Sequence, residues 1–130
     1  MAKKNVNDVD FQICFYENIL NEAPDFIEAL IALGDLYTCK GMIAEGLAVD
    51  IKLSHLRPDD AIILYNLACS YSLSREIDKA FGVMKLALEC GYDDFAFLQG
   101  DEDLEPLRQD VRFQEYFQGY CRKKIAQIKK

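Results

Sequence analysis

Very few residues of this chain have the type and spacing that catalysis or metal binding requires. The one histidine, His55, stands near the end of a predicted helix, and no cysteine or second histidine lies at metal-ligand spacing from it. An imidazole in that position more often caps a helix than binds a metal or acts as a base. The acidic run from Asp101 to Glu105 lacks the spaced carboxylates, the glycine and the distant glutamate of a calcium loop. We therefore expect this run to cap a helix.

The signature motifs of the common enzyme classes are also missing. The sequence contains no G-x4-G-K-[ST], G-x-G-x-x-G, G-x-S-x-G or H-E-x-x-H, and so no nucleotide, dinucleotide, hydrolase or zinc-protease signature. We expect a protein that is not an enzyme and that uses no cofactor or metal. The cysteines are odd in number and form no C-x2-C pair, which is typical of reduced thiols in a reducing compartment. Their apolar neighbours predict small packing residues at Cys14, Cys39, Cys69, Cys90 and Cys121.

Composition and charge narrow the classes of partner. A chain of 130 residues that is 51% hydrophobic fits one domain with its own core. The net charge of −7 disfavours nucleic acid, because neutralising phosphates needs a basic surface. The N-terminus has two lysines but no apolar run of signal-peptide length, and no window approaches a membrane span, so we expect a cytoplasmic protein without a membrane partner. The basic residues 122–130 are expected to be a solvated helix end rather than a site for an anionic surface.

The elements that would position any site are helices. Apolar residues recur at helical spacing, and no stretch shows sustained strand alternation. We expect Asp25, Asp59 with Asp60, and Ser74 to cap helix N-termini, and Gly41 and Gly91 to end helices. The expected helices run over residues 8–22, 25–38, 43–55, 59–73 and 76–90, then 94–99 and 103–109, with a last helix from 111 towards 128.

The chain repeats itself with a period of about 34 residues, which is the period of one helix–turn–helix family. A fixed period in this range indicates stacked supersecondary units, each packed on its neighbours. The repeated pairs are Pro24 and Pro58, Asp25 and Asp59, Leu30 and Leu64, Leu33 and Leu67, Tyr37 and Tyr71, and Ile43 and Ile77.

Within the period, Leu30, Leu33, Gly34 and Tyr37 match a W-x2-L-G-x2-Y pattern with leucine in place of tryptophan, and residues 64–71 repeat it. From about residue 8 to 117 the chain therefore resembles a tetratricopeptide repeat protein of bacterial type. The resemblance implies an all-α, right-handed superhelix of helix–turn–helix units that ends in a C-terminal helical cap. It divides a single domain, 1–130, into a lone helix (8–24), two repeats (25–58 and 59–92) and a capping segment with a final helix (93–130).

Two parts of the chain depart from the family pattern. Gly46 and Asp50 occupy positions where the family packs alanine and an aromatic ring, so we expect Asp50 to face solvent through a rotated helix, or to find a donor such as Arg57. No full third copy follows the second. The segment 94–117 is nevertheless rich in large apolar side chains, which predicts a cap folded onto the second copy with its acidic residues facing water. An acidic interaction arm, the alternative, would need few aromatic residues.

The resemblance also implies a binding surface. Tetratricopeptide arrays bind extended peptides or helices in a concave groove lined by the first helix of each copy. By analogy, the groove of this chain is lined by Glu28, Ile31, Asp35, Thr38, Ile62, Tyr65, Asn66, Cys69 and Ser72. The amide of Asn66 could bond a peptide backbone, or bond water or a neighbouring helix. The ring of Tyr65 could anchor a ligand, or be partly buried against the next helix.

Two functions follow as expectations. The first is a scaffold or adaptor, a monomer or weak homodimer, that binds a peptide segment or helix of another protein. The second is a small acidic chaperone for a secreted bacterial protein, which usually dimerises through its N-terminal helix. An accessory subunit of an enzyme is a third possibility. The groove is not expected to bind the acidic tails of heat-shock chaperones, because Ala96 and Gly100 stand where those domains carry cations.

Overall fold

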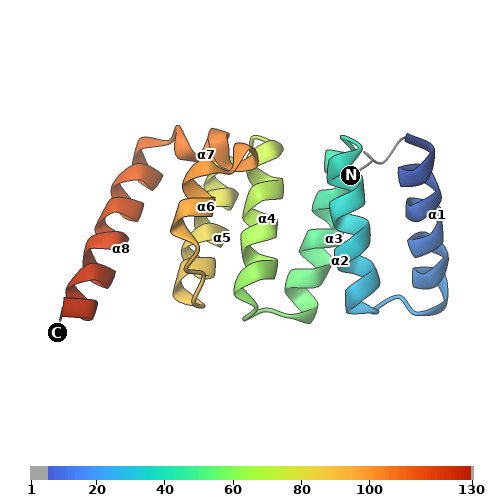
Figure 1. Ribbon diagram of the computed structural model, residues 1–130, viewed down its shortest axis with the longest axis horizontal. Helices are drawn as coiled ribbons and strands as arrows, with labels where there is room; N and C mark the ends of the chain where they lie inside the picture. Colours follow the sequence, from blue (N-terminus) through green and yellow to red (C-terminus); the bar gives the residue numbers. More distant parts are fainter. Residues whose placement is uncertain (1–5, 130) are drawn as a thin grey trace.

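The computed structural model describes residues 6–129, which fold as a row of helices without a strand (Figure 1). The expected all-α stack is confirmed. Residues 1–5 with the N-terminal lysines, and Lys130 of the basic end, lie outside the described residues. No helix within 6–129 is both long and apolar enough to cross a membrane. The elements are α1 (Val6–Glu22), α2 (Ile27–Cys39), α3 (Ile43–Leu56), α4 (Ala61–Leu73), α5 (Ile77–Glu89), α6 (Phe95–Gly100), η1 (Glu102–Leu104), α7 (Glu105–Arg108) and α8 (Val111–Lys129).

The period of the sequence is also a period of the backbone. Helices α2 and α4 begin and end one period apart, and α3 and α5 begin one period apart. The loop after each first helix turns through a residue with positive φ, Gly41 (83°) in one unit and Arg75 (63°) in the next. Glycine adopts this conformation freely, as predicted for Gly41 and Gly91, whereas arginine does so at a cost. The same hydrogen bond closes both loops, Met42 N to Tyr37 O and Glu76 N to Tyr71 O.

The predicted helix caps are only partly correct. The carboxylate of Asp60 accepts hydrogen bonds from two amides in the first turn of α4, at 3.0 and 3.1 Å, and is the expected N-cap. Asp25 does not cap α2, because that helix begins only at Ile27; its carboxylate lies 3.3 Å from the ammonium group of Lys52 instead. Ser74 lies at the C-terminus of α4, not at the N-terminus of α5.

The C-terminal third keeps the repeat register, although its sequence does not show a full third copy. Helices α6 and α8 begin one period after α4 and α5. The first helix of this unit is broken into α6, η1 and α7, because Pro106 has no N–H for a continuous helix and stands in the first turn of α7. The backbone N–H of Leu107 donates to Ser72 Oγ at 3.1 Å, which fastens α7 to α4.

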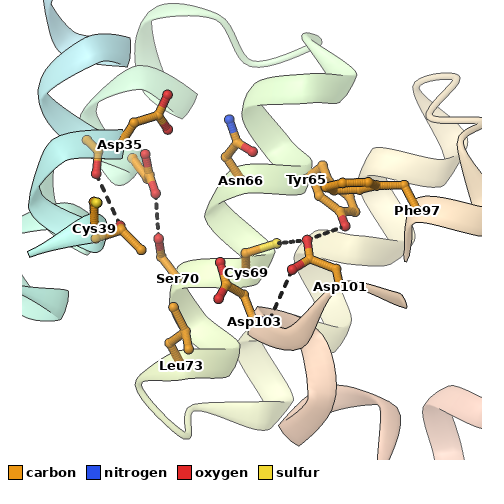
Figure 2. Close-up of a pocket in the computed structure, with 13 residues that line it drawn as sticks. Asp35, Cys39, Tyr65, Asn66, Cys69, Ser70, Leu73, Phe97, Asp101 and Asp103 are labelled. Atoms are coloured by element: carbon orange, nitrogen blue, oxygen red, sulfur yellow. Dashed lines mark hydrogen bonds between the residues drawn. The ribbon is translucent and has the colours of Figure 1, made fainter. Parts of the chain in front are cut away.

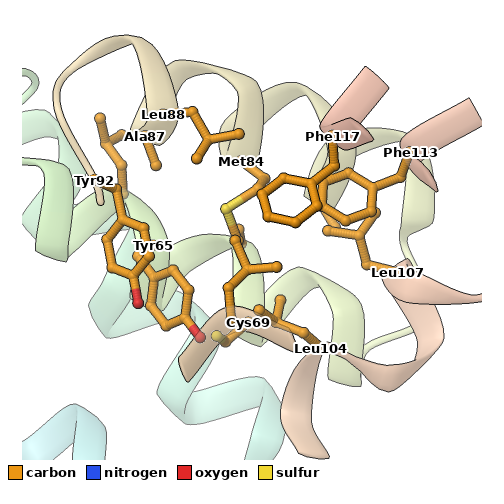
Figure 3. Close-up of a cluster of buried hydrophobic side chains, with 14 residues drawn as sticks. Tyr65, Cys69, Met84, Ala87, Leu88, Tyr92, Leu104, Leu107, Phe113 and Phe117 are labelled. Atoms are coloured by element: carbon orange, nitrogen blue, oxygen red, sulfur yellow. The ribbon is translucent and has the colours of Figure 1, made fainter. Parts of the chain in front are cut away.

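This segment covers the exposed end of the second copy, as predicted. The side chains of Leu98, Leu104 and Leu107 are fully buried, and Phe113 and Phe117 of α8 pack in the same cluster as Met84 of α5 (Figure 3). The hydroxyl of Tyr120 on α8 donates to the carbonyl of Leu88 at 2.8 Å. Burying a large apolar side chain contributes roughly 1.5–3 kcal/mol, so this cluster is a major source of stability.

The N-terminal end of the stack is held by a smaller cluster. Val9 and Ile13 of α1 pack against Leu33, Leu36 and Tyr37 of α2. The Tyr37 hydroxyl donates to Glu17 of α1 at 2.5 Å. Burial, and then the Glu17 carboxylate, raise the pKa of Tyr37 to about 12. Helix α1 thus packs on α2 as α3 packs on α4, and the fold is a one-dimensional row of neighbours.

Candidate functional site

A pocket of about 440 Å³ opens between the first helices of the two repeats, α2 and α4 (Figure 2). The segment from α6 to η1 forms its third wall, and one side chain of α3 reaches its floor. The lining residues are Gly34, Asp35, Thr38, Cys39, Asp50, Tyr65, Asn66, Cys69, Ser70, Leu73, Phe97, Asp101 and Asp103. They come from both repeats and from the cap, so the pocket exists only when all three are folded together.

The predicted groove residues divide into three groups. Five of them line the pocket: Asp35, Thr38, Tyr65, Asn66 and Cys69. Glu28, Ile31 and Ile62 are exposed on α2 and α4 outside its lining. The prediction that Ser72 lines the groove is wrong. This side chain is fully buried and accepts the hydrogen bond from α7, because α7 covers the end of α4 where the groove was expected to continue.

The floor of the pocket is Asp50. Asp50 does not face solvent, because it is only 8% exposed. It does find a hydrogen-bond donor, as the alternative expected, but the donor is Ser70 Oγ, at 2.5 Å from Asp50 Oδ2, and not Arg57. The absence of a side chain at Gly34 makes room for it; a Cβ there would lie 3.1 Å from Asp50 Oδ1. Burial raises the pKa of Asp50 to about 6, although the Ser70 hydrogen bond opposes the rise and the charge of Asp35 adds to it.

Asp101 holds the cap side of the pocket in place. Its Oδ1 accepts from the Asp103 N–H at 3.0 Å, so it caps η1 as the sequence predicted. Its Oδ2 accepts from the Tyr65 hydroxyl at 2.7 Å and from the Cys69 thiol at 3.7 Å. The prediction that the acidic residues of this segment all face water is therefore wrong for Asp101, which bonds to α4.

Tyr65 is a structural wall rather than an exposed anchor. Its ring is buried and stacks on Tyr92 with the ring centroids 4.2 Å apart and the planes 6° from parallel. Burial and the Asp101 carboxylate raise the pKa of the Tyr65 phenol. The exposed aromatic residue of the pocket is Phe97 of α6, which is 56% exposed and whose ring centroid lies 6.0 Å from that of Tyr65.

Three lining residues occupy the same position in successive units. Asp35, Cys69 and Asp103 stand one period apart on α2, α4 and η1, and all line the pocket. Sequence reasoning identified the first two but missed Asp103, because the third unit was not recognised; extending the period by one step would have found it. Phe97, Asp101 and Ser70 carried no comparable signal in the sequence.

The prediction that the cysteines are packing residues is wrong for two of them. Cys14 on α1 and Cys39 on α2 are exposed, and Cys39 lies at the pocket wall. Cys90 and Cys121 are half-buried. Cys69 is buried, and burial together with the nearby Asp101 raises the pKa of its thiol, so it stays protonated.

The lining of the pocket is acidic. Four carboxylates line it, and the described lining contains no lysine, arginine or histidine. Burial raises the pKa of Asp35, and burial with its acidic neighbours raises that of Asp103. Of the four, Asp50 is buried, Asp101 and Asp103 are half-buried and Asp35 is exposed, and no cation of the described lining neutralises them. Within residues 6–129 no cluster of histidine, cysteine and acidic side chains has the arrangement of a metal site.

Asn66 lies between Asp35 of α2 and the aromatic wall (Figure 2). Among residues 6–129 its side-chain amide has no hydrogen-bond partner, although one donor and one acceptor on a side-chain amide can pair with the N–H and C=O of an extended backbone. The pocket therefore combines acidic groups with a free amide and an exposed ring.

Comparison with known proteins gives one partial likeness. No protein-family model matches the chain. A stretch of 57 residues is 37% identical to a chloroplastic protein of Arabidopsis thaliana, and the match covers 43% of this chain and 17% of that protein. The chain thus spans only a small part of that relative's length, and the site described above stands on its geometry.

Proposed function

We propose that this protein is a tetratricopeptide-type scaffold or adaptor that binds an extended segment of a partner protein across α2 and α4. One lysine or arginine side chain of that segment occupies the pocket. The observation that carries the proposal is the charge of the pocket, whose described lining has four carboxylates and no cation. The two helix pairs begin one period apart, which supports the repeat type.

The arrangement of the carboxylates suits one long cationic side chain. Asp50 is the most buried of them, while Asp35 on α2 and Asp103 on η1 are more exposed and line the pocket from different elements. Burial is the main cause of the raised pKa values of these three carboxyl groups, and a cation between them stabilises their ionised forms. The exposed face of Phe97 offers a cation–π contact or packs against the aliphatic stem of the entering side chain.

The rest of the surface suits an extended backbone. Asn66 has a free amide beside the pocket, and Ile31 and Ile62 are exposed on the same two helices, where they offer apolar contacts on either side. Such a surface binds by one charged anchor and a few adaptable contacts, which is typical of peptide recognition. The acidic overall balance of the chain also attracts a basic segment during encounter.

The test is binding to an array of short synthetic peptides in which each position is varied in turn. We expect one position that requires lysine or arginine and rejects aspartate and glutamate. For the best peptide, calorimetry should then show that Asp35→Asn and Asp103→Asn each weaken binding by about tenfold or more. Affinity should also fall as the pH is lowered through about 6, because Asp50 becomes protonated.

Asp59→Asn is the matched control. It removes the same charge from an exposed carboxylate outside the pocket, so it changes the long-range field equally but leaves the lining intact. The proposal fails if no position selects a cation, or if Asp59→Asn weakens binding as much as the two pocket substitutions do.

A further inference from the structure

The four carboxylates that line the pocket differ in how much of their hydrogen-bonding capacity is left for a ligand. Both oxygens of Asp101 are engaged, because Oδ1 accepts from the Asp103 N–H and Oδ2 accepts from the Tyr65 hydroxyl (Figure 2). Within residues 6–129, neither Asp35 nor Asp103 accepts a hydrogen bond through its carboxylate. Asp101 therefore helps to build the wall of the pocket, whereas Asp35 and Asp103 are left for a ligand.

Asp50, at the floor, has one engaged oxygen and one that is left over. Its Oδ2 accepts from the Ser70 hydroxyl, and among residues 6–129 no donor bonds to its Oδ1. No side-chain oxygen or nitrogen of the described chain is shut off from solvent without a partner, so Oδ1 must be open to the pocket. The side chain is only 8% exposed, and an unpaired charged acceptor with so little water around it is costly. This oxygen marks the place where a donor of the ligand belongs.

A primary ammonium group fits the three carboxylates that remain. It has three N–H donors that diverge from one nitrogen. The carboxylates line the pocket from three separate elements, with Asp35 on α2, Asp50 on α3 and Asp103 on η1. Each of them then has to supply only one oxygen, and one oxygen is all that Asp50 has free.

A guanidinium group fits these carboxylates less well. Its advantage over an ammonium group is the bidentate pair, in which two parallel N–H groups bind both oxygens of one carboxylate. Ser70 prevents that pairing at Asp50, and bonds within the chain prevent it at Asp101. Both oxygens are free only at Asp35 and Asp103, which are more exposed than Asp50, and solvent weakens an ion pair there.

We propose that the pocket is specific for lysine over arginine, and that Ser70 sets this preference by occupying one oxygen of Asp50. The inference rests on the proposed function, because it names the cation that the pocket takes from the partner. Ser70 acts through Asp50, so it is a positioning residue. The partner therefore presents an unmodified lysine, because each methyl group on the ammonium replaces an N–H donor and acetylation removes the charge.

The comparison of lysine with arginine needs no knowledge of the partner. The ¹⁵N-labelled full chain is titrated with Nα-acetyl-lysine N-methylamide and with the arginine counterpart, and the amide shifts are followed by nuclear magnetic resonance. At about pH 8, above the pKa of about 6 at Asp50, we expect the lysine derivative to bind about fivefold more tightly. The same exchange at the cationic position of the best array peptide repeats the comparison at higher affinity.

A methylated series tests the role of the N–H donors. Affinity should fall from lysine through its mono- and dimethyl forms to trimethyllysine. If a cation–π contact with the exposed ring of Phe97 dominated, trimethyllysine would bind at least as well as lysine, since it keeps the charge. That result, equal affinity for the two cations or a preference for arginine would each overturn this inference and leave the proposed function standing. If neither derivative binds and no array position selects a cation, both fail.

Two variants test the part played by Ser70. Ser70→Ala frees the second oxygen of Asp50 for a bidentate pair, so the ratio of lysine to arginine affinity should fall towards one. Asp50→Asn removes the charge at the floor and should lower the ratio as well, which keeps the test decisive if Ser70→Ala does not fold by circular dichroism. A ratio unchanged from wild type in the folded variants would overturn the proposal.

Thr38→Val is the matched control. It removes another hydroxyl of the lining, but this one donates to the Gly34 carbonyl and to no carboxylate of the described residues. The ratio of lysine to arginine affinity should therefore stay at its wild-type value. A fall as large as that of Ser70→Ala would show that loss of any hydroxyl from the lining is enough, and the role of Ser70 would be refuted.

Discussion

Ser70 on α4 donates a hydrogen bond to Asp50 on α3, across the boundary between the two repeats. Both side chains are buried, so this bond joins one unit to the next in a place that water hardly reaches. A buried carboxylate costs free energy unless it is well bonded or protonated. The pair therefore ties the stability of the stack to pH, and it places a titrating group at the floor of the proposed binding pocket.

Asp50 should make the protein more stable in mild acid than at neutral pH. Its pKa is about 6 in the folded state against an ordinary 3.8, so the folded protein holds this proton more tightly than the unfolded chain. The contribution is complete below 3.8 and is lost as pH rises through about 6, a difference of up to about 3 kcal/mol. Asp50→Asn should remove most of this fall, measured by urea unfolding from mildly acidic to slightly alkaline pH. Asp59→Asn is the control and should keep the wild-type dependence of the free energy of unfolding on pH. If Asp50→Asn keeps it too, Asp50 is not the group responsible.

Tyr65 should be needed for stability, not only for binding. Tyr65→Phe removes the hydroxyl that bonds Asp101 and should lower the free energy of unfolding by about 1.5–3 kcal/mol, because the acceptor is charged. Tyr65→Ala should lower the free energy of unfolding by about 3–5 kcal/mol, because it also removes the ring that packs on Tyr92 and leaves a cavity. The control is Tyr71→Phe on the same helix, which removes a hydroxyl that bonds to no carboxylate within residues 6–129; chemical denaturation should find it close to wild type.

Substitution by alanine should change the stability of the protein in opposite directions at two helical glycines. A Cβ at Gly46 would lie 2.9 Å from Thr38 Oγ1, where α3 crosses α2, so Gly46→Ala should destabilise the protein by about 1–3 kcal/mol. Gly82 on α5 has open space around its missing Cβ, so Gly82→Ala should stabilise by about 0.5–1 kcal/mol through helix propensity. Thermal melts should show a lower melting temperature for Gly46→Ala and a higher one for Gly82→Ala. Equal changes in the two melting temperatures would contradict the close approach of α3 to α2 at Gly46.

Removing the cap should unfold the second repeat. Leu104→Ala leaves a cavity in a fully buried site and should cost about 2–5 kcal/mol. A chain that ends after Asp93 loses all the side chains that cover α5 and should fail to unfold cooperatively when followed by circular dichroism. A soluble 1–93 fragment with an unchanged melting temperature would show that the two repeats stand without the cap.

The cysteines should react in the order of their exposure. Under native conditions, iodoacetamide should modify Cys14 and Cys39 first, and Cys69 only after unfolding, because its thiol is buried and its pKa is raised. Mass spectrometry of the digest reports the order. Alkylation of Cys39 should also hinder peptide binding at the pocket wall, whereas a Cys39→Ser protein alkylated at Cys14 should bind normally.

The fold could be predicted from the sequence because one period accounts for most of it. Leu30 and Leu64, or Tyr37 and Tyr71, occupy equivalent helical positions, and the helix bounds recur with them. The third unit was missed because its sequence keeps the register but not the pattern, and Pro106 breaks its first helix. A repeat hidden in this way is apparent from the register and from the spacing of the helices, and not from the family pattern.

The site was predictable only in part, for a related reason. Helical spacing identified Asp35 and Asn66, which need only a face of one helix. It could not tell that Tyr65 is buried, because α4 is covered on several sides, by α3, α5 and η1. It could not pair Asp50 with Ser70 either, since that contact depends on how closely two units approach at Gly34.

The uneven distribution of the core bears on how a newly made chain folds. The largest cluster of buried side chains joins α4 and α5 to Leu98, Leu107, Phe113 and Phe117, whereas α1 and α2 share a smaller one. A ribosome releases the N-terminal helices first, so the elements that emerge early have the least to pack against. Helix α4 must wait for residues 98–117 before its apolar surface is covered. Until that segment has left the ribosome, the apolar surface of α4 and α5 is open to chaperones and proteases.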